Sequence, residues 1–293
     1  MSQNVTIQDV ADRADVSIGT VSRVLNGHGA APDTQKRVLK VASDLDYRVN
    51  LFARGMRGAR KNCIGILVEG RIDEGDPWLE SIVLSMSRVI SDSGYHCMID
   101  FWDEEQSNLP RIAEAVDGCM LLGNYSEEFF RRLQKRNGIP LVTYEEKMPY
   151  ENGESLRIDW KAGMHEALGY LLGLDHSKVG LVVAGLNYPS LRNRYEGYLE
   201  AMDRHGQEVN DGLISTSPDV PGGTFQAGCD LTERLVRRRP DLTAIIYGSD
   251  TMAVGGMQKL RSMGLRIPED VSVVGFDDSA WARVTVPPLT TEG

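Results

Sequence analysis

The residues that most often carry chemistry are scattered in this chain of 293 residues. Asp277 and Asp278 are adjacent carboxylates, but neighbouring side chains at the end of a strand point apart and cannot easily share one acid–base task. We find no glycine-rich phosphate loop, no H-E-x-x-H motif and no G-x-S-x-G motif in a strand–turn–helix setting. The five histidines are dispersed, and the four cysteines form no C-x-x-C pair. We therefore expect no enzyme, no metal site, no cofactor, and reduced buried thiols.

Charge is distributed unevenly along the chain, whose net charge is −10. Residues 1–61 contain ten Lys and Arg against six Asp and Glu, whereas residues 62–293 contain 22 against 36. A basic segment on an acidic remainder indicates that only the first segment meets nucleic-acid phosphate. No apolar run approaches the roughly 20 residues of a membrane span, and the first residues lack a signal-peptide pattern. We expect a cytoplasmic protein without membrane contact.

Short helices are predicted in residues 1–48. Thr6 and Asp9 have the spacing of a capping box at the start of a first helix. Ser17 is a suitable N-cap for a second helix, and Pro32 is favourable at the first position of a third. Residues 49–61 are polar and basic and contain two glycines, which predicts a linker that folds on contact with a partner.

Strand and helix patterns alternate from residue 62 onward, which predicts an α/β fold with two lobes of doubly wound parallel sheets. We expect a body at 62–293, with lobe one at about 62–153 and lobe two at about 154–293. The predicted strands are Cys63–Val68, His96–Phe101, Gly118–Leu122, Leu141–Tyr144, Lys178–Val183, Ala244–Tyr247 and Val271–Phe276.

Motifs at both ends of the chain carry a resemblance to a known family. The first is TVSRVLN at 20–26, which closes a helix-turn-helix pattern that begins at Val5. The second is VSVVGFDD at 271–278, followed by PPLTT at 287–291. With this spacing, essentially the whole chain resembles the LacI/GalR (lactose-repressor-like) family of bacterial transcription regulators. The resemblance implies an all-α helix-turn-helix head and a two-lobed, periplasmic-binding-protein-like core that closes on a small ligand.

The second helix of a helix-turn-helix enters the major groove with its first turn near the base edges. The resemblance implies that Ile18, Gly19 and Arg23 read bases. Arg23 is the strongest candidate because its guanidinium can bind guanine at two atoms. The alternative is a surface arginine that only neutralises phosphate. Phosphate contacts or helix capping are expected of Thr6, Ser17, Thr20, Ser22 and Asn26.

The linker resembles the hinge helix of the family, in which paired hinges of a dimer lie in the minor groove. Met56 occupies the position whose side chain wedges a base step open, and Asn50 and Arg54 are expected to contact DNA beside it. Val49 stands where the family usually has proline, and Gly55 costs up to about 1 kcal/mol of helix stability relative to alanine. This hinge should therefore depend on DNA for its folding, unless it is a flexible linker with an exposed Met56.

The resemblance also implies an effector site in the body. Arg194 falls at the family's effector-binding arginine, Asp277 at its ligand carboxylate, Glu145 at a further polar position and Trp78 at a frequent stacking aromatic. A carboxylate and a guanidinium can hold adjacent hydroxyls while an indole packs on a C–H face, which favours a sugar or sugar derivative over a nucleoside or purine. The alternatives are a structural Arg194–Asp277 ion pair and a core position for Trp78.

Three features depart from the family pattern. Ser249, another expected pocket residue, stands where the family often has asparagine, so an amide donor is lost. Trp160 follows Asp159 at a position that is also often asparagine. Family members usually continue for a few tens of residues beyond the point where this chain ends, at Gly293, so we expect either a truncated chain or an incomplete connection between the lobes.

The sequence favours a transcriptional repressor that binds a pseudo-palindromic DNA operator as a homodimer. A small molecule is expected to control this binding allosterically. One alternative is a regulator that binds DNA without an effector, given Ser249 and the short C-terminus. Another is a transport-type sugar-binding protein, in which the basic head would have no role. Effector identity, the sign of regulation, the operator and the choice between dimer and tetramer stay open.

Overall fold

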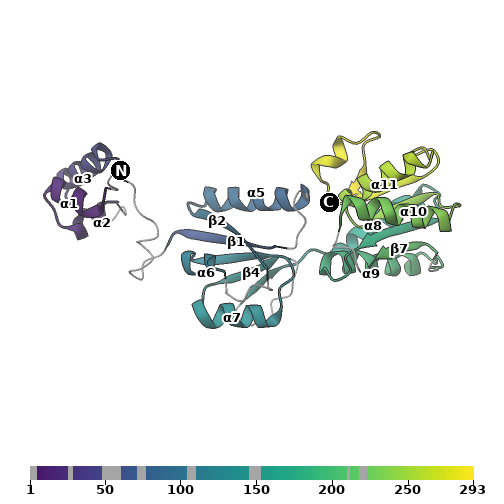
Figure 1. The fold of residues 1–293 in the computed structure, drawn as a ribbon, viewed down its shortest axis with the longest axis horizontal. Coiled ribbons are helices and arrows are strands. Elements are labelled where there is room, and N and C mark those ends of the chain that lie inside the picture. The colour runs from purple at the N-terminus through teal and green to yellow at the C-terminus, as the bar shows by residue number, and fades with distance from the viewer. Residues whose placement is uncertain are drawn as a thin grey trace. The chain divides into compact units, whose positions relative to one another are not determined.

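The computed structural model describes residues 5–25, 29–47, 61–70, 77–103, 110–144, 153–209, 212–217 and 223–293. Contacts within the chain divide it into two units, which we call the head (Met1–Lys61) and the body (Asn62–Gly293). Both are drawn in Figure 1.

The head contains the helices α1 (Ile7–Ala14), α2 (Ile18–Leu25) and α3 (Pro32–Asp44). A capping box begins α1: Thr6 Oγ1 accepts a hydrogen bond from Asp9 N at 3.3 Å, and Asp9 Oδ2 accepts one from Thr6 N at 2.7 Å. Thr6 Oγ1 also donates to Asp9 Oδ2 at 2.7 Å, and this bond, followed by the one from Thr6 N, holds the pKa of Asp9 below its ordinary value. The three helices enclose a small apolar core of Val10, Ala11, Ala14, Val21, Val24, Val38 and Ala42.

The body contains two five-stranded sheets whose strands pair in parallel. Sheet A has the order β2-β1-β3-β4-β5 and forms lobe one; sheet B has the order β10-β9-β8-β6-β7 and forms lobe two. Numbered along the chain within each lobe, sheet A follows the doubly wound order 2-1-3-4-5, and sheet B, read from β7, follows the same order. This confirms the predicted fold class.

The strands of sheet A are β1 (Cys63–Glu69), β2 (His96–Trp102), β3 (Gly118–Leu122), β4 (Leu141–Tyr144) and β5 (Glu154–Leu156). Those of sheet B are β6 (Val179–Ala184), β7 (Ile214–Ser217), β8 (Ala244–Tyr247), β9 (Ser272–Phe276) and β10 (Thr290–Glu292).

Helices cover both faces of each sheet. In lobe one, α5 (Pro77–Asp92) lies on one side of sheet A, and α6 (Ile112–Ala115) and α7 (Glu127–Asn137) lie on the other (Figure 1). Side chains of β1 alternate accordingly, since Ile66 packs with the α5 cluster and Leu67 with the α7 cluster. In lobe two, α8 packs against α9, and α10 packs against α11. The helices of lobe two are α8 (Trp160–Gly173), α9 (Pro189–Arg204), α10 (Phe225–Arg238), α11 (Asp250–Ser262) and the short 3-10 helix η1 (Ala280–Arg283).

Each of the seven predicted strands is present within about one residue of its expected bounds, whereas β5, β7 and β10 were not predicted. These three strands have three or four residues each, and each lies at the edge of its sheet. Because β5 pairs with β4 in sheet A, the expected change of lobe at about residue 154 falls one strand too early.

Two glycines allow α10 and α11 to approach closely. A Cβ atom on Gly228 would overlap the carbonyl oxygen of Met252, and a Cβ on Gly255 would overlap that of Phe225. Each glycine thus faces the backbone of the opposite helix, which cannot move aside as a flexible side chain could. This crossing positions α11, which begins at Asp250.

We expect Gly228→Ala to lower the free energy of unfolding of the body by about 1–3 kcal/mol, because the added methyl group forces the two helices apart. Urea unfolding followed by circular dichroism measures the change. Gly173→Ala is the matched control, since no atom lies within 4 Å of its Cβ position and it should shift stability by less than about 0.5 kcal/mol. Equal losses in both variants would show that the crossing tolerates the methyl group.

Candidate functional site

The outward face of α2 presents polar and small residues to solvent. Ser17, Gly19 and Arg23 are exposed, whereas Val21 and Val24 are buried in the head core. A Cβ on Gly19 would meet only Ser17 Oγ, at 3.8 Å. Glycine at position 19 is therefore required neither by a positive φ nor by a close neighbour. Because it has no side chain, a partner can approach the helix closely at this point.

Hydrogen bonds fix the first turn of α2. Ser17 Oγ accepts a hydrogen bond from Thr20 N at 3.2 Å and lies 3.0 Å from Thr20 Oγ1. Ser17 thus caps α2 as Thr6 caps α1, and capping is one of the two roles expected of these residues. Ile18 and Ser22 are half-buried, and Ile18 packs against the head core, so only part of its side chain can reach a partner. The expected contact residues Asn26, Asn50, Arg54 and Met56 lie outside the described residues.

Arg194 is a buried charged residue of lobe two with several partners. It comes from α9, is 3% exposed, and donates from one terminal nitrogen to Asp277 Oδ1 at 2.7 Å. The other terminal nitrogen donates to the carbonyl oxygen of Gly248. Asp277 follows β9 and Gly248 follows β8, so one guanidinium joins α9 to the carboxyl ends of two central strands. Ligands of doubly wound folds bind at this edge.

Two aromatic rings pack on the same guanidinium. Arg194 Cζ lies 4.1 Å from the centroid of Trp160 and 4.2 Å from that of Phe276. The two ring centroids are 5.6 Å apart, so the rings form a corner around the guanidinium and do not enclose it from opposite faces. Such contacts stabilise a cation that is withdrawn from water. The sequence did not predict a role for either ring; the one available signal was Trp160 at a helix start where the family often has asparagine.

A buried carboxylate holds the turn that carries Asp277. Asp250 is 1% exposed and accepts hydrogen bonds from Ser279 N at 2.7 Å and from Thr291 Oγ1 at 2.6 Å. Burial raises the pKa of Asp250, and these two hydrogen bonds counteract the rise. The backbone N–H of Asp277 donates to Glu292 O at 2.6 Å. The turn after β9 is therefore tied both to α11 and to the last strand.

Ser249, an expected effector residue, has a structural role. Its Oγ accepts a hydrogen bond from Met252 N at 3.2 Å and donates to Gly223 O at 3.2 Å. The hydroxyl thus caps α11 and binds the segment before α10. It lies one residue from Gly248, which accepts from Arg194, so Ser249 belongs to the same edge of sheet B.

The corresponding edge of sheet A carries aromatic and acidic groups. Trp78 is half-buried, and its ring centroid lies 5.7 Å from that of Tyr144, at the carboxyl end of β4. Glu69 ends β1, is buried, and accepts a hydrogen bond from Asn124 N at 2.9 Å. The expected polar residue Glu145 lies outside the described residues. The expected effector residues of lobe two are thus brought together, whereas Trp78 belongs to lobe one.

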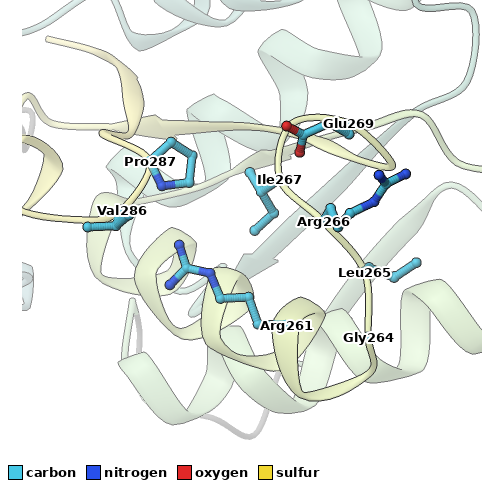
Figure 2. A pocket seen from close by; sticks show the side chains of 8 residues that line it. All are labelled: Arg261, Gly264, Leu265, Arg266, Ile267, Glu269, Val286 and Pro287. Carbon is cyan, nitrogen blue, oxygen red and sulfur yellow. The ribbon is translucent and has the colours of Figure 1, made fainter.

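Figure 2 shows an open pocket of about 450 Å³ elsewhere in lobe two. Leu265, Ile267, Val286 and Pro287 give it an apolar lining, beside Arg261. These residues precede β9 and β10, so the pocket lies at the amino ends of the strands, opposite to Arg194 and Asp277. None of the expected effector residues lines it.

Neither a metal site nor a membrane-spanning helix is found within the described ranges. No three His, Cys, Asp or Glu side chains there are grouped so that they could hold a metal ion. No helix in the same ranges has the length and apolar character needed to cross a membrane.

Comparison with known proteins assigns the chain to a family. Residues 6–50 match the family model of bacterial regulatory proteins, lacI family, and residues 168–292 match the periplasmic binding protein-like domain. The transcriptional repressor PurR of Haemophilus influenzae is 30% identical over 293 residues, which cover 98% of this chain and 85% of PurR. The chain belongs to the LacI family.

Solved structures agree with this assignment. The complex of the transcriptional regulator CelR with cellobiose matches with 26% identity and a TM-score of 0.69, over 98% of this chain and 87% of that one. The lac repressor dimer bound to operator has a TM-score of 0.82 at 23% identity, over 99% and 87% of the two chains, and supports the fold alone. As a LacI-family member the chain is a DNA-binding transcription regulator, and PurR and CelR are regulators too.

The buried ion pair of this LacI-family regulator should dominate the stability of lobe two. We expect Asp277→Asn to lower the free energy of unfolding by roughly 3 kcal/mol, because the guanidinium of Arg194 keeps its charge without a buried counter-charge. Asp278→Asn is the matched control: Asp278 also has a positive φ, but its carboxylate is 54% exposed and lies 3.4 Å from an exposed Arg283. Chemical unfolding of both variants should show a large loss for the first and almost none for the second; similar losses would contradict a dominant role for the buried pair.

Proposed function

We propose that this regulator binds a pseudo-palindromic operator in double-stranded DNA as a homodimer, and that a small molecule bound in the body controls this binding. The observation that carries the DNA-reading part is the outward face of α2. Gly19 and Arg23 lie on a helix whose opposite face is buried, and Ser17 caps its first turn. A helix of this kind, presented by a basic head, fits the major groove.

A sugar is the effector that the body favours. CelR, a relative, is described in complex with cellobiose. The carboxylate of Asp277 and the guanidinium of Arg194 lie side by side at the carboxyl end of sheet B, and together they offer an acceptor and donors to adjacent hydroxyls. In lobe one, Trp78 packs against the core cluster that contains the buried Tyr144, and only the exposed part of its ring is available to a ligand. A nucleoside is the second choice, and the sign of regulation is that of a repressor.

One observation favours regulation without an effector. Arg194 and Asp277 form a salt bridge, with side chains only 4% and 8% exposed, and Ser249 is used as a helix cap. In this second candidate function the pair is structural and DNA binding is constitutive. Titration of sugars against operator-bound protein separates the two candidates, since only the first predicts a change in operator affinity.

The proposed function involves no chemical turnover. The residues of the site form a binding constellation of an ion pair and aromatic rings, and none of them is paired as nucleophile and base. A regulator of bacterial genes acts where the DNA is, so we infer that the protein works in the cytoplasm.

Apolar side chains on α5 and β2 supply a surface for the second copy. Leu84 and Val89 on α5 are 66% and 65% exposed, and Phe101 on the neighbouring edge strand β2 is 63% exposed. The described part of β2 has a partner strand on one side only. An exposed apolar face beside an open sheet edge is typical of an interface, and a two-fold operator requires a second head.

The decisive experiment is selection of bound sequences from random duplex DNA, with and without a panel of sugars and nucleosides. A two-fold-symmetric site whose enrichment changes with one compound is the expected result. Selection of no preferred sequence by the folded protein would refute the proposal.

We expect Arg23→Ala to weaken operator binding about tenfold or more and to relax the preference at one base pair of each half-site, because a bidentate contact to guanine contributes roughly 1–3 kcal/mol. Fluorescence anisotropy on the selected operator and on its single-base variants measures both effects. Arg37→Ala, which removes an exposed arginine of α3, is the control and should leave base preference unchanged. Equal weakening of all sequences by Arg23→Ala would reduce Arg23 to a phosphate contact.

For the dimer, Phe101→Glu should produce a monomer, because a charge placed in an apolar interface is costly to bury. Sedimentation velocity reports the mass, and operator affinity should fall together with it. Tyr170→Glu changes a similarly exposed aromatic residue of α8, 55% exposed, and should leave the dimer intact. A dimeric Phe101→Glu protein would rule out this surface.

A further inference from the structure

The carboxyl end of sheet B is acidic. Within the described residues, the segments that directly follow its strands contribute Asp250 after β8 and Asp277 and Asp278 after β9, and they contribute no lysine or arginine. The cation of the site, Arg194, comes from α9. Among its described residues, this edge thus holds two buried carboxylates, Asp250 and Asp277, against one buried guanidinium, Arg194.

The positive charge of Arg194 is already matched. Its salt bridge to Asp277 has an N–O distance of 2.7 Å, and both side chains are almost fully buried. An anionic ligand that approached the guanidinium would have to displace Asp277 or lie beside its carboxylate. In a site screened this poorly by water, like charges at close range repel strongly.

The other arginines near this edge are occupied as well. Arg192, in the first turn of α9, donates its Nε–H to Leu186 O at 2.9 Å. Arg283, on η1, pairs with Asp278 at 3.4 Å. Both are exposed to solvent, which screens them, so neither provides a desolvated charge to compensate an anion at Arg194.

What Arg194 can still offer suits an uncharged acceptor. Its Nε is buried and has no hydrogen-bond partner among the described residues. An unpaired buried donor destabilises the site, and a hydroxyl or carbonyl oxygen could accept its hydrogen bond without adding charge. Trp160 and Phe276 hold the guanidinium in one orientation, which limits its ability to turn away from Asp277.

We infer that the effector of this regulator is an uncharged hydroxyl-bearing molecule, and that Asp277 is the specificity residue that discriminates against its phosphorylated form. This inference rests on the proposed function only in taking the carboxyl end of sheet B as the effector site. A phosphate group placed against Arg194 should reduce affinity about tenfold or more, because it meets the Asp277 carboxylate.

Inorganic phosphate is a probe that requires no knowledge of the effector. The full chain is titrated with phosphate against sodium chloride of equal ionic strength, and tryptophan emission is followed, because Trp160 packs on Arg194. Phosphate binding by the head contributes equally in every variant of the body. The wild-type response should therefore match that of Arg194→Gln. A saturable wild-type response that Arg194→Gln abolishes would overturn the inference.

The variant Asp277→Asn supplies the positive arm. Without the carboxylate, Arg194 becomes available to anions, so this variant should gain a saturable phosphate response that the double variant Asp277→Asn/Arg194→Gln lacks. The wild-type arm decides the question even if the variant folds poorly. Matched pairs, glucose against glucose 6-phosphate and adenosine against adenosine monophosphate, extend the test to organic ligands; tighter binding of the phosphorylated member would also overturn it. Operator binding measured on the same samples tests the proposed function separately.

Discussion

The carboxyl end of sheet B depends on holding a charged guanidinium out of water. Burying an unpaired arginine costs several kcal/mol, and Arg194 avoids this cost with one carboxylate, one carbonyl oxygen and two ring faces. These partners come from four places: Asp277 after β9, Gly248 after β8, Phe276 at the end of β9 and Trp160 at the start of α8. All four partners must be correctly placed before the charge of Arg194 is compensated. The ion pair therefore specifies how the helices seat against the sheet, in addition to what the edge can bind.

The backbone conformation at this edge also depends on tertiary contacts. Asp277 and Asp278 have φ values of 114° and 42°, which few residues other than glycine adopt. The turn keeps this conformation because Asp250 accepts Ser279 N and Thr291 Oγ1, while Asp277 N donates to Glu292 O. A Cβ on Gly275 would overlap the Asp250 carboxylate, so glycine is needed just before the turn. The buried carboxylate of Asp250 thus shapes the turn that carries the carboxylate of Asp277.

The sequence predicted most of the fold, and physical reasons explain what it missed. Long apolar runs predicted the central strands, and Thr6 and Ser17, as N-caps, predicted where α1 and α2 begin. The missed strands β5, β7 and β10 are edge strands with the sequences ESL, ISTS and TTE, which carry too few apolar residues to give a periodic signal. Resemblance supplied Arg194 and Asp277 as a pair of site residues. It could not supply the Gly248 carbonyl or the rings of Trp160 and Phe276, because those contacts arise only when α8, β8 and β9 meet in space.

Regulation with an effector and regulation without one differ in what Asp277 does when a ligand arrives. A ligand shifts an equilibrium only if it binds one state better than the other. If a hydroxyl group replaces Asp277 as a partner of Arg194, the carboxylate must find a new partner, and the turn joined to Glu292 and, through Asp250, to α11 must adjust with it. The ligand then has differential contacts with two states of the body. If Asp277 keeps Arg194 and the ligand only accepts a hydrogen bond from Arg194 Nε, the turn stays fixed and the differential contacts must come from other parts of the body. Both cases use the same fold, so whether the turn after β9 responds to a ligand depends on whether this one buried pair exchanges partners.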